Sequence, residues 1–115
     1  MVQPSLPAEV PDVTPDLLSD EVYLLDVREP DEWDAGHAPH AHHIPMREIP
    51  ARLAEVPTVG EVVVVCRVGG RSAQVAAYLA AQGWENVANL DGGMLAWEAS
   101  GRAIVADTGL PARVL

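Results

Sequence analysis

The residues best suited to chemistry form one short stretch around the only cysteine of the chain. The stretch reads Cys66-Arg67-Val68-Gly69-Gly70-Arg71-Ser72 and follows four consecutive valines at positions 62–65. A glycine-bearing turn between a buried strand and a helix N-terminus can direct several backbone N–H groups at one point. The helix dipole and two arginines add positive potential, which favours the thiolate form of a cysteine. We therefore predict that Cys66 is a reactive thiolate that can hold an anion, the alternative being an inert buried thiol.

The elements around this loop alternate between strands and helices. The sequence predicts strands over residues 22–27, 41–44, 61–65 and 87–90, and helices over residues 30–35, 47–55, 72–82 and 93–100, with a short helix after Thr14. The run at 61–65 is β-branched without polar alternation, which is typical of a strand covered on both faces. We predict an α/β fold with a central, mainly parallel sheet of about five strands, flanked by helices on both faces. Ligands bind such sheets at the carboxyl ends of the strands, where Cys66 and Asp26 both fall.

Composition narrows the classes of partner and compartment. The chain has 115 residues, enough for one domain, and carries a net charge of −10 with no lysine. This charge argues against nucleic acids and anionic membrane surfaces as partners. The N-terminus does not resemble a signal peptide, and no apolar run is long enough to span a membrane. A single cysteine excludes an internal disulfide and favours a reducing, cytoplasmic setting.

Three ordered motifs make the sequence similar to the rhodanese family of sulfurtransferases. The loop matches the family pattern C-x-x-G-x-R at Cys66, Gly69 and Arg71. Residues 25–29 read Leu-Asp-Val-Arg-Glu and precede Glu32-Trp33 and Gly36-His37, and residues 90–97 read Leu-Asp-Gly-Gly-Met-Leu-Ala-Trp. The resemblance covers residues 12–102 and implies a single rhodanese-like domain. Residues 1–11 would form an irregular lead-in, and residues 103–115 a C-terminal tail, either docked or disordered.

The resemblance also implies a reaction and a set of site residues. Cys66 would take sulfane sulfur from thiosulfate, or from another sulfane-sulfur donor, and pass it as a persulfide to cyanide or a thiol acceptor. No metal or organic cofactor is required, and the protein would be a monomer or a homodimer. Backbone N–H groups of the loop would stabilise the anionic persulfide. The predicted substrate-binding residues are Arg67, Val68, Gly69, Gly70, Arg71 and Ser72.

The charged residues of these motifs allow more than one role. We expect Arg67 to reach the mouth of the pocket, whereas Arg71 is suited equally to donor binding and to an ion pair with an acidic side chain. As supporting residues, Asp26 is expected to order the loop and Arg28 to form a salt bridge with Glu32. The four histidines lack a convincing metal-ligand spacing. His40 stands where relatives often carry glycine, so a positive φ there would cost energy.

Several other functions compete with sulfur transfer from thiosulfate. Cysteine phosphatases and arsenate reductases on this fold use C-x₅-R, but here Arg71 comes one residue earlier and Ser72 occupies the required position. Family members that use mercaptopyruvate usually carry an uncharged loop, and regulatory modules with this fold often lose the cysteine. A persulfide carrier for a protein partner would keep the same loop, so the sequence leaves that alternative open.

Overall fold

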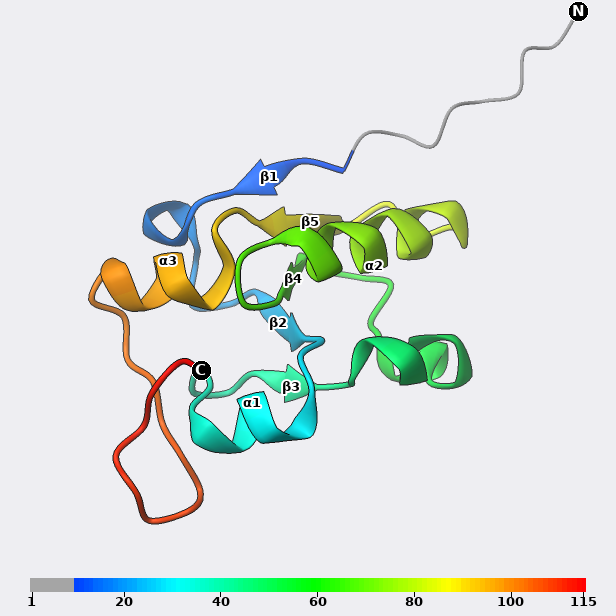
Figure 1. The fold of residues 1–115 in the computed structure, drawn as a ribbon. Coiled ribbons are helices and arrows are strands. Elements are labelled where there is room, and N and C mark those ends of the chain that lie inside the picture. The colour runs from blue at the N-terminus through cyan, green and yellow to red at the C-terminus, as the bar shows by residue number, and fades with distance from the viewer. Residues whose placement is uncertain (1–9) are drawn as a thin grey trace, which may run out of the picture.

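The core of the molecule is a five-stranded sheet in which every paired strand is parallel. The computed structural model describes residues 10–115, so the predicted lead-in lies outside the described residues except for its last two. The strands are β1 (Asp12–Val13), β2 (Tyr23–Asp26), β3 (His42–His43), β4 (Val62–Val65) and β5 (Val87–Leu90), and the helices are α1 (Pro30–Ala35), α2 (Gly70–Ala81) and α3 (Gly93–Ala99). The sheet order is β1-β5-β4-β2-β3 (Figure 1). The predicted α/β architecture is confirmed.

The four valines of β4 explain why helices cover both faces of the sheet. All four are fully buried, and successive side chains of a strand point to opposite faces. Val62 and Val64 pack in one cluster with Val75 and Leu79 of α2. Val63 and Val65 pack in a second cluster with residues of α3, which include Met94 and Trp97. The apolar run is therefore the centre of a three-layered domain, and it ends directly at Cys66.

Some local predictions are corrected by the structure. The segment predicted as a helix over 47–55 forms two 3-10 turns, Met46–Ala51 and Leu53–Glu55, because Pro50 has no N–H to continue a helix. The turn after Thr14 is also a 3-10 helix, and the Thr14 side chain makes no capping hydrogen bond. Strand β1 was not predicted, since its two residues carry no periodic signal and form a strand only by pairing with β5.

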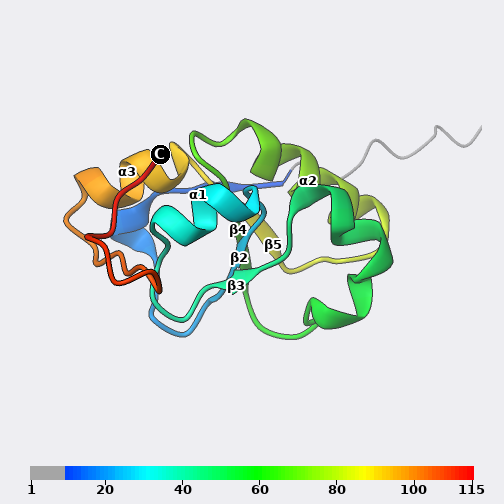
Figure 2. The ribbon, with the colours of Figure 1, turned by 60° about the horizontal axis from the view of Figure 1, so that its bottom comes forward.

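Residues 103–115 dock on the domain rather than extend away from it. The N–H of His37 donates to the carbonyl of Val105 at 2.9 Å, and the N–H of Val105 donates back at 2.8 Å. Ile104 and Val114 pack against the α3-side cluster. Figures 1 and 2 both place the C-terminal end beside α1. No helix within residues 10–115 has the length and apolar character needed to cross a membrane.

Candidate active site

Cys66 lies immediately after β4, where the chain turns into α2, and its side chain is almost completely buried. Two hydrogen-bond donors of the loop reach its sulfur. The backbone N–H of Gly69 lies 3.1 Å from Sγ, and the hydroxyl of Ser72 lies 3.2 Å from it. Ser72 itself is buried on the inward face of α2, as its spacing from Val75 and Leu79 predicts. The loop therefore places two hydrogen-bond donors at the sulfur.

These donors favour the charged form of the sulfur. Burial raises the pKa of the Cys66 thiol, because desolvation penalises the thiolate, but the hydrogen bonds outweigh this effect. The Ser72 hydroxyl and the backbone N–H groups of Ser72, Gly69 and Val68 each lower the pKa, and the net result lies below the ordinary value of a cysteine. The geometry can thus stabilise a thiolate, and equally a second anionic sulfur placed at the same donors.

Two glycines give the loop its shape, and one of them, Gly93, lies outside the predicted site. Gly69 has a φ of 114°, a conformation that residues with a Cβ rarely adopt. Gly93, at the start of α3, lies under the loop, and a Cβ there would be 2.3 Å from the carbonyl oxygen of Cys66. This approach lets Met94 and Leu95 donate backbone N–H groups to the carbonyls of Cys66 and Arg67 at 2.8 and 3.1 Å. The sequence signal for this approach is the Gly92-Gly93 pair at the start of the helix predicted over residues 93–100.

The second arginine of the loop forms an ion pair with α1. Arg71 Nη1 and Nη2 donate to the two carboxylate oxygens of Glu32 at 2.7 and 2.9 Å. The hydrogen bond from Arg71 lowers the pKa of Glu32 to about 2, although burial opposes it. The same carboxylate accepts the backbone N–H of Glu29 at 3.0 Å and so also caps α1. Of the two roles that the sequence allowed for Arg71, the structure contains the ion pair.

The predicted Arg28–Glu32 salt bridge is wrong, because Arg28 pairs with Asp26. Both side chains are fully buried, and Arg28 Nη2 lies 2.7 Å from the Asp26 carboxylate. The remaining guanidinium donors of Arg28 reach the carbonyls of Gly36 and Glu32, at 2.8 and 3.3 Å. This pair ties the end of β2 to α1, and β2 in turn pairs with β4, which leads into the Cys66 loop.

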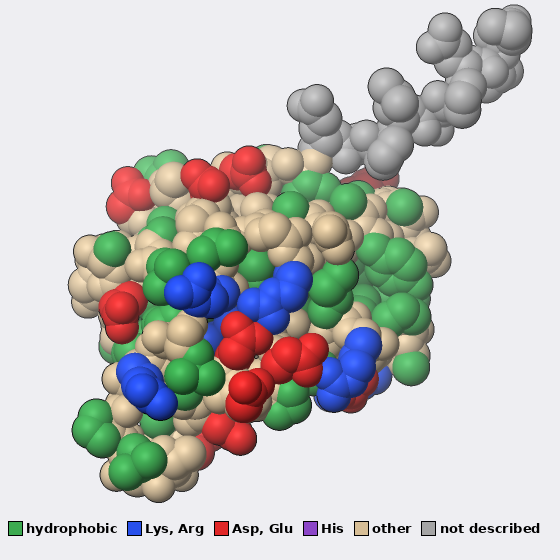
Figure 3. Space-filling view, viewed as in Figure 1, with side chains coloured by type: hydrophobic (Ala, Val, Ile, Leu, Met, Phe, Trp, Pro, Cys, Tyr) green, Lys and Arg blue, Asp and Glu red, His purple; other side chains and the backbone are tan. Residues whose placement is uncertain are grey.

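The three remaining loop residues, Arg67, Val68 and Gly70, are exposed. The side chain of Val68 is 55% exposed at the tip of the loop. Arg67 is also exposed, and its Nε donates to the backbone oxygen of Leu115 at 2.6 Å, a contact with the tail that the sequence did not predict. Acidic and basic side chains lie next to one another on the face seen in Figure 3. Arg47–Glu29 and Arg71–Glu32 are two of the ion pairs among the described residues.

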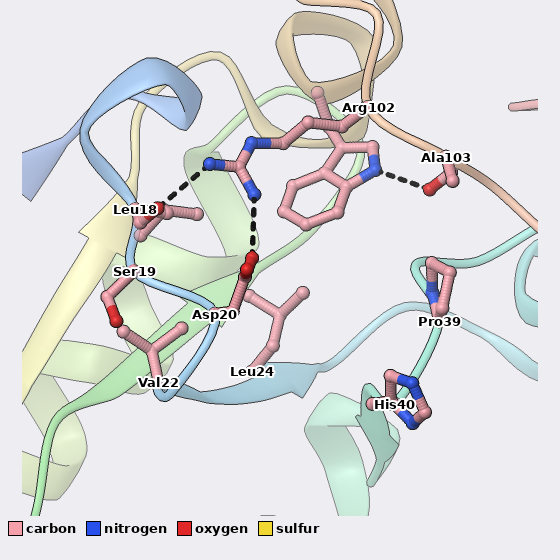
Figure 4. A pocket seen from close by; sticks show the side chains of 10 residues that line it. Leu18, Ser19, Asp20, Val22, Leu24, Pro39, His40, Arg102 and Ala103 are labelled. Carbon is pink, nitrogen blue, oxygen red and sulfur yellow. Dashed lines mark hydrogen bonds and ion pairs between the residues drawn. The ribbon is translucent and has the colours of Figure 1, made fainter.

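The contacts of the histidines are with aromatic rings and backbone groups of the domain. Trp33 stacks on His37 with ring centroids 3.6 Å apart, and His37 Nδ1 lies 2.9 Å from the Trp33 carbonyl. Across residues 10–115, no group of three or more potential ligands could hold a metal ion. His40 has a φ of 63°, so it has the positive φ that glycine adopts more readily than histidine. His40, Leu24 and Trp97 help to line a hollow of about 440 Å³ (Figure 4). The residues that line this hollow do not include any from the Cys66 loop.

Comparisons with known proteins agree with this architecture. Residues 11–100 match the rhodanese-like domain family. A sulfurtransferase of Allochromatium vinosum is 45% identical over 91 residues, which cover 79% of this chain and 85% of that protein. The thiosulfate sulfurtransferase GlpE of Pseudoalteromonas translucida is 36% identical over 81 residues, which cover 70% and 77% of the two chains.

The solved structures give the same result for the fold. The crystal structure of a rhodanese-related protein from Thermoplasma volcanium has a TM-score of 0.78 at 26% identity and covers 84% of this chain and 99% of that one. The family model matches most of the sequence, the two relatives are each more than 33% identical to it, and the central strand of the parallel sheet ends at Cys66. The chain therefore belongs to the rhodanese-like domain family.

Proposed function

We propose that this protein is a thiosulfate sulfurtransferase in which Cys66 carries the sulfur. The observation that carries the proposal is the ring of donors at Sγ, formed by Gly69 N–H and the Ser72 hydroxyl. The relatives named as sulfurtransferases support sulfur transfer as the reaction class, and the name of the Pseudoalteromonas relative supports thiosulfate as donor.

The chemistry follows from the thiolate and its donors. The Cys66 thiolate attacks the outer sulfur of thiosulfate, a new S–S bond forms, and the S–S bond of thiosulfate breaks. Sulfite leaves with the electron pair of that bond, and the enzyme is left as an anionic Cys66 persulfide. Cyanide or an acceptor thiolate then attacks the terminal sulfur and regenerates the Cys66 thiolate. Because the chain has one cysteine, the acceptor must come from outside it.

The same geometry disfavours phosphate or arsenate as substrate. Arg71 donates one hydrogen bond from each Nη group to Glu32, and this ion pair offsets the positive charge that an oxyanion would need. The loop is also one residue shorter than C-x₅-R, so its amides converge on a smaller target. We infer that the cradle suits one sulfur atom better than a tetrahedral oxyanion.

Transfer to a protein partner is the second candidate, because Val68 presents an exposed apolar side chain beside the loop. In that case the protein would act as a persulfide carrier, and thiosulfate would substitute for the physiological donor. The cytoplasmic location and the choice between monomer and homodimer stay predictions from the sequence.

Intact-mass analysis after exposure to thiosulfate tests the proposal. We expect a gain equal to one sulfur atom in the wild-type protein, none in Cys66→Ser, and loss of the gain when cyanide is added. Hydrolysis of aryl phosphates without any sulfur adduct would instead support the phosphatase alternative. A persulfide that resists cyanide and small thiols but transfers to a protein acceptor would favour the carrier.

A further inference from the structure

The hollow that His40 helps to line is separate from the Cys66 site (Figure 4). Its lining includes Leu24 and Trp97, which belong to the apolar cluster on the α3 side of the sheet, whereas Cys66 belongs to the cluster on the α2 side. Leu24 pairs with Val63, which precedes Cys66 by three residues, so the two sites are also offset by about 10 Å along the strands. The hollow therefore plays no part in holding the sulfur.

The size and the lining of the hollow are those of a small-ligand site. Its volume of about 440 Å³ lies within the range of about 300 to 1,000 Å³ that ligand pockets occupy. Figure 4 shows Asp20 and Arg102 on one side of the hollow and Pro39 and His40 on the other. The polar groups thus come from three segments, which precede β2, follow α1 and follow α3. An apolar space with a few convergent polar groups is typical of a site for a small organic molecule.

Arg102 is held in place and keeps hydrogen-bond donors for a ligand. Its Nη2 donates to the Leu18 carbonyl at 2.9 Å, and its guanidinium lies over the Trp97 ring, 5.0 Å from the centroid. The ring is fixed in turn, because the indole N–H donates to the Ala103 carbonyl at 2.9 Å. Within residues 10–115, Nη1 of Arg102 pairs only with the Asp20 carboxylate, at 4.0 Å, which is beyond hydrogen-bond distance. A preorganised guanidinium with unused donors is suited to a carboxylate.

Asp20 places a negative charge beside this guanidinium. Its side chain is fully exposed, and within the described part of the chain no side-chain or backbone group donates a hydrogen bond to its carboxylate. An exposed pair of opposite charges 4.0 Å apart contributes little, so a ligand can separate the two charges at small cost. The rim therefore offers a cationic and an anionic group side by side.

His40 lines the hollow in a strained backbone conformation. Its φ of 63° lies in the left-handed region, which glycine enters freely and a residue with a Cβ does not. Its ring makes no hydrogen bond with any residue from 10 to 115, so polar contacts within the domain do not offset this strain. Backbone strain of this kind is concentrated at ligand sites, where the position of the side chain is used.

We propose that this hollow is a binding site for a free amino acid with an apolar side chain. Arg102 binds the carboxylate of the amino acid, and Asp20 binds its ammonium group. The apolar side chain fills the space beside Leu24 and Trp97, and His40 forms the opposite wall. An α-amino acid carries its two charged groups on one carbon, which matches two opposite charges 4.0 Å apart. This function is additional to sulfur transfer and does not depend on it.

Titration followed by NMR tests the proposal, with L-phenylalanine and L-leucine as probes. We expect saturable shifts of the amides of residues 18–24, 39–40 and 97–103, with a dissociation constant on the order of 1 mM, as is typical of ligands of this size. 2-Phenylethylamine lacks the carboxylate and 3-phenylpropanoate lacks the ammonium group. Each should bind about fivefold more weakly than phenylalanine, the size of one exposed ionic contact. An analogue that binds as tightly as phenylalanine would overturn the proposal, as would the absence of saturable shifts with both amino acids.

Two variants assign the charged groups of the ligand. Asp20→Asn should weaken the binding of phenylalanine about fivefold without weakening that of 3-phenylpropanoate, which has no ammonium group. Arg102→Gln should weaken phenylalanine by a similar factor without weakening 2-phenylethylamine, which has no carboxylate. Asp16→Asn is the matched control, since Asp16 is an exposed acid of the same segment that does not line the hollow, and it should keep the wild-type affinity. If Asp20→Asn affects both ligands equally, or neither, the proposal is wrong.

His40→Gly separates a role in binding from a role in stability. Glycine relieves the strain at a φ of 63°, so the Tm should rise by a few degrees. Loss of the ring removes one wall of the hollow, so the affinity for phenylalanine should fall several-fold. A merely structural role would change stability and affinity in the same direction. Wild-type affinity in both His40→Gly and Arg102→Gln would overturn the assignment of this hollow as the site.

Discussion

At the scale of single residues, the state of Cys66 is decided by the groups that donate to its sulfur. Burial alone raises the pKa of the thiol, so without donors the loop would hold a neutral, unreactive cysteine. The Ser72 hydroxyl, at 3.2 Å, is the side-chain donor among these groups and can be removed without disturbing the backbone. Its contribution can therefore be measured separately from the fold.

We expect Ser72→Ala to raise the pKa of Cys66 and to slow sulfur transfer at neutral pH. In the wild-type protein, the midpoint of iodoacetamide alkylation against pH should lie below the value of about 8.5 for a free cysteine. In Ser72→Ala the midpoint should move upward, and alkylation at neutral pH should become several-fold slower. Ser72→Cys is unsuitable as a control because it adds a thiol, whereas Ala73→Ser on the exposed side of α2 should leave the profile unchanged. An unchanged midpoint in Ser72→Ala would show that the backbone amides alone set the pKa.

At the scale of elements, two contacts hold the loop in place: the ion pair between α1 and α2 and the N-terminus of α3 beneath the loop. The first joins Glu32 to Arg71 and the second brings the N–H groups of Met94 and Leu95 to the loop carbonyls. Both contacts hold the amides of the loop toward Sγ. We expect loss of the ion pair to change how stability depends on pH, and loss of the contact at Gly93 to lower both stability and kcat.

The ion pair should make stability depend on pH in acid. The folded-state pKa of Glu32 is about 2, below its ordinary value of 4.5. A lowered pKa means that the carboxylate stabilises the fold fully above pH 4.5 and loses this contribution as the pH falls toward 2. We expect Glu32→Gln, which keeps an oxygen to cap α1, to cost about 1 to 2 kcal/mol at neutral pH, less than a fully buried pair because Arg71 is partly solvated.

Urea denaturation as a function of pH checks this expectation. The difference between the wild-type protein and Glu32→Gln should shrink through the acid range and vanish near pH 2. Arg47→Gln, which breaks the exposed pair with Glu29, provides a comparison that should cost much less. A difference that persists at low pH would mean that Glu32 acts through packing instead of charge.

Gly93→Ala should damage the loop from below. Its Cβ would be 2.3 Å from the Cys66 carbonyl oxygen and 2.6 Å from the Arg67 carbonyl carbon, and its φ is 57°. We expect a loss of about 2 kcal/mol or more in stability and a fall in kcat, because the loop amides would no longer converge on the sulfur. Gly60→Ala is the matched control: it has a φ of 81° but open space around the added Cβ, so it should cost stability with no change in kcat.

At the scale of the whole molecule, the tail belongs to the folded domain. Ile104 and Val114 pack on the α3-side cluster, and the indole N–H of Trp97 donates to the Ala103 carbonyl at 2.9 Å. A boundary after residue 102, which the family resemblance implies, would therefore cut through packed structure. The tail also carries the contacts with α1 and with the Cys66 loop.

We expect a protein truncated after Arg102 to remain folded but to lose about 2 kcal/mol of stability, which corresponds to a fall of about 10 °C in Tm. Loss of partly buried apolar surface and an unpaired indole N–H are the causes. Thermal denaturation followed by circular dichroism measures the change, with Leu110→Ala as a control that should keep the wild-type Tm. An unchanged Tm after truncation would show that the tail contributes no stability.

Sequence alone was sufficient for the local features of the fold and for the place of Cys66 at the end of a buried strand. The valines of β4, the helix that begins beside Gly70 and the single cysteine between them are each specified by neighbouring residues, and the parallel sheet follows from the alternation of elements. The residue types around Cys66 predicted a reactive thiolate, and sulfur transfer followed from the resemblance of three motifs to the rhodanese family. The sequence marked His40 as a position where a positive φ would cost energy, and the structure has a φ of 63° there.

Only the tertiary structure decided which charged groups pair and which segments approach the loop. Arg28 has carboxylates available at Asp26 and at Glu32, and its choice depends on the path of β2 into α1, so the sequence prediction was wrong. Gly93 approaches Cys66 from 27 positions away in the sequence, and Arg67 contacts Leu115 from 48 positions away. The sequence carries no periodic signal for contacts between residues this far apart. Local patterns specify elements because their causes lie within a few residues, whereas the partners of a side chain are set by the packing of elements that are distant in the chain.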